Sequence, residues 1–222
     1  MNWKWKKESI LNTYDKNTDC KEIFKATCDE IGEYFSKKGW KYAKSKPKIT
    51  FKNKSIKFEI SFWSSRSNTP GEYVNLEIIP TFVSLELIKK LKNEGVSSKG
   101  FMGFPNFYRL SEKVPKGKEQ IIKVFGEPIK RDSRYNENEG IMIYSNNINI
   151  YNISEIDFLK IIDFIETQIT SWIEWSDDYQ KLIKFYNYSL SYHKKQMIEK
   201  NFLHYMIMKF PDKQVEILKT IQ

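Results

Sequence analysis

The spacing of apolar residues changes along the chain, and each change predicts a different kind of element. Over residues 20–38 the apolar side chains recur every three or four positions, and the run ends at Lys37, Lys38 and Gly39. This spacing gathers apolar side chains on one face of a helix, and a glycine after basic residues is a frequent helix end. Asp19 stands where an N-cap is needed. We therefore predict a helix over residues 20–38.

A two-residue period follows the helix. Apolar and polar residues alternate over 49–52, again over 56–62 and again over 74–78, with short polar connections between the runs. Alternation of this kind is typical of strands with one buried and one solvated face. Three such strands in succession predict an antiparallel meander.

Helical spacing returns in the last third of the chain. Ser84 is the expected cap of a short helix, and Ser154 is the expected cap of a long amphipathic helix that runs to Trp172. Further helices are expected after Asp178 and after Pro211. Between the two halves we expect a glycine-rich loop over 95–117, a short helix over 119–125, and one or two strands over 141–153.

Together these elements predict an α+β fold with an N-terminal helix, an antiparallel meander and a long helical C-terminal tail packed on it. Residues 1–153 would form the sheet domain with a lead-in segment, and residues 154–222 the helical tail of the same domain. The chain has 222 residues, of which 40% are hydrophobic, so it can bury a substantial core. This composition excludes the disordered, collagen-like and disulfide-scaffold classes.

Two features predict a cytoplasmic protein without a membrane partner. No run of apolar residues follows the N-terminus, and no segment approaches the length of a membrane span. Cys20 and Cys28 are eight positions apart on the predicted helix, about 12 Å along its axis, which is too far for a disulfide. We expect two free thiols, which suit a reducing compartment.

The net charge of +9 is concentrated in one part of the chain. Residues 34–58 hold nine lysines and no acid, with aromatic residues among them. Lysines interleaved with aromatics are typical of surfaces that bind nucleic acid through phosphates and stacking. The candidate residues for such a site are Lys37, Lys38, Trp40, Lys41, Lys44, Lys46, Lys48, Lys52 and Lys54. The alternative is a solvated sheet face, or a sheet edge guarded by lysines.

The polar side of the meander is a second candidate surface. Trp63 and Tyr73 are unexpected there, because their neighbours on that side are charged or polar. Either the C-terminal helices cover these rings, which is the explanation we favour, or the rings anchor a partner protein. The candidate partner-binding residues are Lys57, Glu59, Trp63, Tyr73, Asn75 and Glu77.

Catalytic motifs are absent from the sequence. It contains no phosphate-binding loop, dinucleotide fingerprint, nucleophile elbow or H-E-x-x-H pattern. His193 and His204 have no cysteine or carboxylate at metal-ligand spacing. A nuclease arrangement of Glu59, Glu77 and Lys57 on paired strands is a minor hypothesis. We therefore predict no catalytic residue, no metal and no cofactor.

The order of elements from Phe24 to Phe82 resembles a bacterial family. Its members share one amphipathic helix that ends in a glycine-aromatic pair, here Gly39 and Trp40, followed by lysine-rich strands and a strand of the type seen at 74–78. Most members are domains of unknown function, and related ones occur near toxin–immunity and phage-defence genes. The resemblance covers the first 60–80 residues of the fold and implies a small α+β cytosolic protein. It brings no functional residues.

Two functional hypotheses follow. The first is a non-enzymatic bacterial protein that binds another protein, as an immunity- or defence-associated protein does. The second is a nucleic-acid-binding accessory protein that uses the lysine-rich segment. The sequence leaves the partner's identity and the oligomeric state open.

Overall fold

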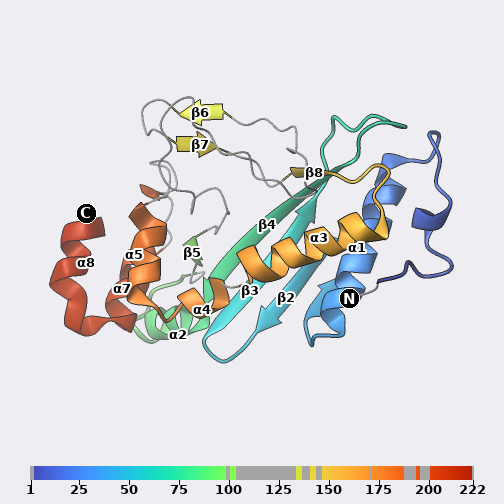
Figure 1. The fold of residues 1–222 in the computed structure, drawn as a ribbon. Coiled ribbons are helices and arrows are strands. Elements are labelled where there is room, and N and C mark those ends of the chain that lie inside the picture. Colours follow the sequence, from blue (N-terminus) through green and yellow to red (C-terminus); the bar gives the residue numbers. More distant parts are fainter. Residues whose placement is uncertain are drawn as a thin grey trace.

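The computed structural model describes residues 3–98, 101–103, 134–136, 141–143, 147–170, 172–187, 194–195 and 201–221. Within these ranges one helix precedes an antiparallel sheet, and several helices follow it (Figure 1). The predicted α+β class is confirmed. The helix expected over 119–125, most of the glycine-rich loop before it, and His193 lie outside the described residues.

Helix α1 (Cys20–Ser36) forms where the apolar spacing predicts it. The Asp19 carboxylate caps its first turn by accepting the backbone N–H of Lys21 at 2.8 Å. Beyond the helix, Gly39 has a φ of +85°, a left-handed conformation that glycine adopts without strain. Cys20 and Cys28 are buried, free thiols.

The predicted meander is confirmed, and it is longer than the sequence pattern suggests. Strands β2 (Lys48–Lys52), β3 (Ile56–Trp63) and β4 (Asn75–Ser84) pair in chain order, all antiparallel. Strand β1 (Lys41–Ala43) adds an edge beside β2. At the other edge, β5 (Phe101–Gly103) and β8 (Asn147–Asn149) pair with opposite ends of β4. The strands β6 (Arg134–Asn136) and β7 (Ile141–Ile143) form a separate antiparallel pair.

One face of the sheet is covered by α1 and by α3 (Glu155–Phe164), which continues as a π-helical turn over Ile165–Ile169. Figure 1 shows α3 crossing in front of the sheet beside α1. The hydroxyl of Tyr34 on α1 donates to the carboxylate of Glu166 at 3.2 Å and so joins the two helices. Their buried side chains belong to one core with the apolar side chains of β2, β3 and β4.

The N-terminal lead-in is packed across these two helices. The ring of Trp3 lies 5.6 Å from Tyr34 and 5.5 Å from Phe158, and Trp5 lies 5.1 Å from Phe158. A short 3-10 turn, Ile10–Asn12, leads on toward α1. The aromatic residues of the lead-in therefore belong to the fold, because they close the seam between α1 and α3.

Helix α2, which directly follows β4, and the C-terminal helices form a second cluster beside the sheet. Their bounds are α2 Leu85–Asn93, α4 Trp172–Trp175, α5 Tyr179–Asn187, α7 Phe202–Lys209, the 3-10 turn Pro211–Lys213 and α8 Gln214–Ile221. Lys209 joins this cluster to the sheet through α2, because it pairs with Glu86 at 3.2 Å and with Asp177 at 2.5 Å. Among the described helices, none combines the length and apolar character needed to cross a membrane.

Candidate partner-binding face

The face of the sheet that α1 and α3 leave open is the candidate site. Strand residues alternate between the two faces, and the register aligns the outward residues in rows. Thr50, Glu59 and Thr81 form one row, and Lys48, Ser61 and Ile79 form the next. We call this surface the polar sheet face, and its members are Lys41, Lys48, Thr50, Lys52, Lys57, Glu59, Ser61, Trp63, Glu77, Ile79, Thr81 and Val83.

Trp63 is the most unusual residue of the polar sheet face. It ends β3, stands opposite Glu77 on β4, and is 65% exposed. The C-terminal helices do not cover it, so the explanation that we favoured from the sequence is wrong for Trp63. The side chain is left open to a partner.

Tyr73 and Asn75 are less accessible than the partner-binding role expected from the sequence requires. The Tyr73 hydroxyl donates to the Asn75 side-chain oxygen at 3.1 Å, and Asn75 is only 3% exposed. The backbone N–H of Asn75 in turn donates to the side chain of Asn68 at 2.9 Å. Asn75 therefore holds the start of β4 in place and is not accessible to a partner. Tyr73 is half-buried beside it.

Glu59 lies near the middle of the polar sheet face and binds two lysines. Its carboxylate is 2.6 Å from the Lys48 ammonium and 2.9 Å from that of Lys57. Burial opposes ionisation of Glu59, but the hydrogen bonds from the two lysines outweigh it and hold its pKa below the ordinary 4.5. The carboxylate offsets part of the positive charge of Lys48 and Lys57.

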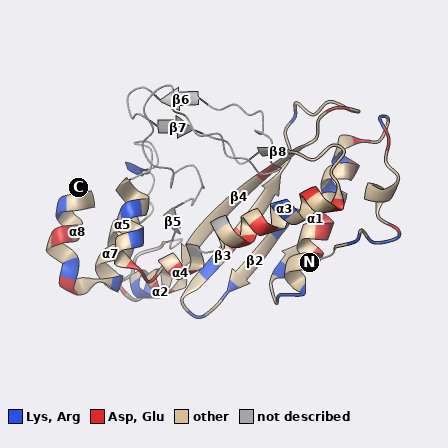
Figure 2. Ribbon diagram, viewed as in Figure 1, with Lys and Arg blue, Asp and Glu red and all other residues tan. Residues whose placement is uncertain are grey.

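The remaining lysines of the 34–58 segment divide into two groups. Lys37 pairs with Glu33 at 3.3 Å, Lys38 pairs with Glu166, and Lys44 lies 3.6 Å from Asp29. The others are exposed, and within the described part of the chain they make no ion pair. They are Lys41, Lys46, Lys52 and Lys54. Basic residues are spread over β2 and β3, while acidic residues gather on α1 and α3 (Figure 2).

Trp40 is not part of this basic surface. Its ring centroid lies 5.3 Å from that of Phe35, 5.6 Å from Phe51 and 6.0 Å from Phe58. Phe58 is fully buried, as the alternation along β3 predicts. Trp40 therefore packs against the core under β2 and β3, and we leave it out of the candidate surface.

The nuclease arrangement is not assembled. Glu59 stands opposite Thr81, whereas Glu77 lies four residues further along β4, opposite Trp63. Four strand residues span about 13 Å, which is too far for two carboxylates to share a metal ion. Among the residues described, no group of three or more His, Cys, Asp or Glu side chains could hold one.

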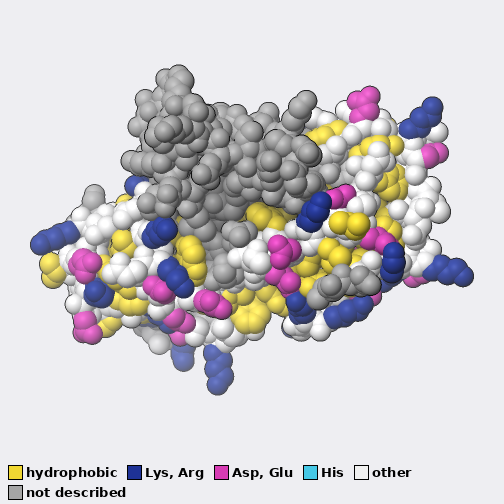
Figure 3. All heavy atoms as spheres, in the orientation of Figure 1, with side chains coloured by type: hydrophobic (Ala, Val, Ile, Leu, Met, Phe, Trp, Pro, Cys, Tyr) yellow, Lys and Arg dark blue, Asp and Glu magenta, His cyan; other side chains and the backbone are white. Residues whose placement is uncertain are grey.

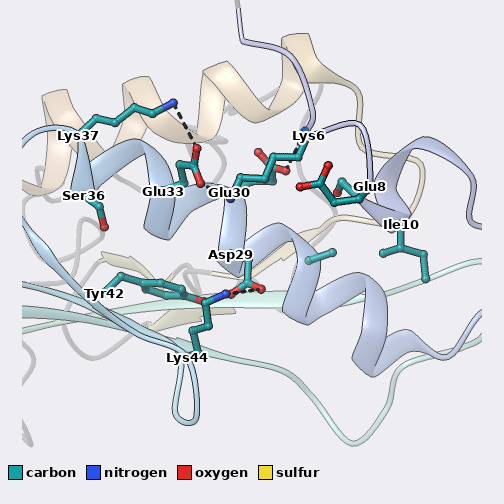
Figure 4. A pocket seen from close by; sticks show the side chains of 12 residues that line it. Lys6, Glu8, Ile10, Asp29, Glu30, Glu33, Ser36, Lys37, Tyr42 and Lys44 are labelled. Carbon is teal, nitrogen blue, oxygen red and sulfur yellow. Dashed lines mark hydrogen bonds and ion pairs between the residues drawn. The ribbon is translucent and has the colours of Figure 1, made fainter.

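A hollow of about 710 Å³ lies on the other side of the molecule, between the lead-in, α1 and β1 (Figure 4). Glu33 pairs there with both Lys6 and Lys37, and the Tyr42 hydroxyl donates to Asp29 at 2.8 Å. Burial, followed by the bond to Asp29, raises the pKa of Tyr42 well above its ordinary value. These charged groups are engaged with one another and hold the lead-in against α1.

Glu30, only 2% exposed, makes the deepest of these contacts, since its carboxylate accepts the indole N–H of Trp3 at 2.9 Å. Around this region the surface mixes acidic, basic and apolar side chains (Figure 3). We therefore interpret the hollow as part of the packing of the lead-in and place the candidate site on the polar sheet face.

Sequence reasoning did not extend the polar sheet face along β4 to Ile79, Thr81 and Val83. The sequence does contain a weak indication of these residues. Phe82 and Ser84 continue the alternation of inward-facing residues beyond Pro80, so the residues between them face outward. No family model, curated protein or solved structure matches this chain. The geometry of the polar sheet face is therefore the basis for assigning a function.

Proposed function

We propose that this protein is a non-enzymatic binding protein that contacts another protein through the polar sheet face. The observation that supports this proposal is the exposure of Trp63, 65% of its surface, on a strand of a well-packed sheet. An exposed tryptophan has an unfavourable contact with water, and tryptophan is enriched among the residues that dominate protein–protein binding energy. The resemblance of residues 24–82 to a bacterial family with relatives near toxin–immunity and phage-defence genes favours an immunity or defence role.

The composition of the polar sheet face favours a protein over a nucleic acid as the partner. Ile79 and Val83 are half-buried, uncharged members of the face, and their remaining apolar surface suits a protein partner. Glu59 and Glu77 would oppose a phosphate backbone. The basic members are all lysines, whereas bidentate phosphate binding prefers arginine.

Affinity capture from the source cells with matched variants tests the proposal. Trp63→Ala should lose a protein that the unchanged chain captures, because truncating a central interface tryptophan weakens binding by about 2 kcal/mol or more, roughly thirtyfold. The control is Val215→Ala on α8, since Val215 is 68% exposed and lies outside the face. A captured protein that both variants retain equally would contradict the proposal.

A second candidate function is nucleic-acid binding, and it is favoured by four exposed lysines that make no ion pair within the described residues: Lys41, Lys46, Lys52 and Lys54. It predicts that a labelled oligonucleotide binds at ~50 mM salt and is largely released at ~200 mM. Reversing the four lysines to glutamate should abolish the binding, as fluorescence anisotropy would report. Binding that ignores salt, or no binding at the lower concentration, would rule this candidate out.

A further inference from the structure

The polar sheet face has a lysine-rich side and a side that is mostly uncharged. On the side of β1 and β2 stand three lysines that project from the sheet: Lys41, Lys48 and Lys52. On the side of β4 stand the uncharged residues Ile79, Thr81 and Val83, with Glu77 at one end opposite Trp63. Each of the three rows that reach β2 therefore runs from a lysine on β1 or β2 to an uncharged residue on β4, whereas the row of Trp63 ends at Glu77.

The length of the face matches one helix. From Lys57 to Trp63 along β3 there are six residue steps, which span about 20 Å. A helix of about 13 residues has this length, and its diameter of about 10 Å covers two to three strands spaced about 4.8 Å apart. Helices already pack in this manner on the opposite face of the same sheet.

We infer that the partner binds as an amphipathic helix with an acidic flank, laid along β3. Its apolar stripe packs on Trp63, Ile79 and Val83, and its carboxylates face the lysines of β1 and β2. The inference rests on the proposed function, because it names the part of a protein partner that the face receives. Charge complementarity decides the choice: four lysines outnumber the two acids of the face, and three of the four, Lys41, Lys48 and Lys52, lie on its β1 and β2 side.

Other occupants match the face less well. A second copy of the chain that offered the same face would bring no acidic row to meet the lysines. A single-stranded nucleic acid would bring phosphates to the lysines and a base to Trp63, but it would leave Ile79 and Val83 without apolar contact. A helix with an apolar stripe and an acidic flank can contact the apolar residues of β4 and the lysines of β1 and β2 at the same time.

Three fluorescein-labelled probes test the inference on the full chain. The first is a designed amphipathic helix of about 14 residues with a leucine stripe and glutamate flanks. The second is its twin with lysine in place of every glutamate, and the third is an oligothymidine of similar length. Anisotropy titration should show that the glutamate peptide binds at least about tenfold more tightly than the lysine peptide.

Two sets of variants assign this preference to the face. Changing Lys41→Glu together with Lys52→Glu should reverse the ranking of the two peptides. The same charge change at the exposed residues Lys21 and Lys25 on α1 should leave the ranking intact. Trp63→Ala should weaken the glutamate peptide about tenfold or more without changing which peptide binds better.

Equal affinity for the two peptides, tighter binding of oligothymidine, or no binding of any probe would overturn the inference. These outcomes are separable from failure of the proposed function. A captured protein partner that depends on Trp63 but is indifferent to the Lys41→Glu and Lys52→Glu changes would leave the proposed function standing and refute the acidic helix. A partner indifferent to Trp63 would refute the function itself.

Discussion

Gly32 on α1 is a position where one methyl group should destabilise the fold. A Cβ at residue 32 would lie 2.3 to 2.5 Å from ring carbons of Tyr42, closer than non-bonded atoms approach in folded proteins. Tyr42 belongs to β1, the edge strand that carries Lys41 of the polar sheet face. In Gly32→Ala, the Tyr42 ring must move, and with it the packing of β1 against α1.

The expected magnitude combines three effects. Forcing a methyl group into a packed contact costs about 1–3 kcal/mol. Moving Tyr42 also endangers its 2.8 Å hydrogen bond to Asp29, and a hydrogen bond to a charged group contributes about 1.5 kcal/mol or more. Alanine in a helix interior is favoured over glycine by about 1 kcal/mol, which offsets part of the loss. The net decrease in the free energy of unfolding should be about 2 kcal/mol.

Urea denaturation of four proteins measures this effect: the unchanged chain, Gly32→Ala, Tyr42→Ala and the double variant. Without the ring at position 42 the three closest contacts of the added methyl group are gone, so Gly32→Ala should then stabilise the protein by up to about 1 kcal/mol. The sign of the same substitution therefore depends on Tyr42. A stabilising Gly32→Ala in the presence of Tyr42, or the same effect in both backgrounds, would refute the proposed close contact.

Three further predictions follow from the structure, each measured by the free energy of unfolding in urea. Trp63→Ala should change the free energy of unfolding by less than about 0.5 kcal/mol, because Trp63 is exposed, whereas Trp40→Ala should lower it by about 3 kcal/mol, because Trp40 packs against the core. Equal effects of the two substitutions would contradict these positions of the two rings. Ser84→Ala should cost about 1 kcal/mol, since the buried Ser84 hydroxyl accepts the Leu87 N–H at 3.1 Å, and Ser84→Thr should cost less. Lys6 and then Lys37 hold the pKa of Glu33 below its ordinary 4.5, so their pairing stabilises the fold above that pH and is lost as the pH falls through the lowered value. The stability advantage over Glu33→Gln should be present at neutral pH and shrink in acid; an advantage that grows in acid would show that the carboxylate is not stabilised by these lysines.

The sequence predicted the central strands and most helix ends because local chemistry determines them. Ser84 and Ser154 cap the helices that follow them, and the alternation along 56–62 buries Phe58 and Ile60. Strand β1 was not predicted, because three residues are too few to show the two-residue alternation of a strand. The strand predicted at 74–78 was shorter than β4, because Ile78, Ile79 and Pro80 interrupt the alternation of apolar and polar residues. In both cases the strand is defined by its pairing with a neighbouring strand and not by the local sequence pattern.

The candidate site could be predicted only in part. Alternation identified Lys57, Glu59, Trp63 and Glu77 as one surface, and the register confirms that they share a face. Their accessibility depends on tertiary contacts that no local pattern contains. The alternation along β4 places Asn75 on the outward side, yet Asn75 is buried where it forms hydrogen bonds with Tyr73 and Asn68. The segment around Trp40 looked like a binding surface because its aromatics lie among lysines in the sequence, but the turn after α1 directs that ring into the core.

The lysine-rich segment also shows why composition alone is a poor guide to a binding surface. Lys37 and Lys38 are next to each other in the sequence, yet they pair with carboxylates on different helices, Glu33 and Glu166. By contrast, Lys41 and Lys52 are eleven residues apart, and the pairing of β1 with β2 places both on the polar sheet face. The fold thus divides a run of like charges into two groups: one pairs with carboxylates on α1 and on the continuation of α3, and the other faces outward from the sheet. Because only the second group shares its face with an exposed tryptophan, charge reversal at Lys41 and Lys52 tests binding, whereas charge reversal at Lys37 and Lys38 tests the stability of the fold.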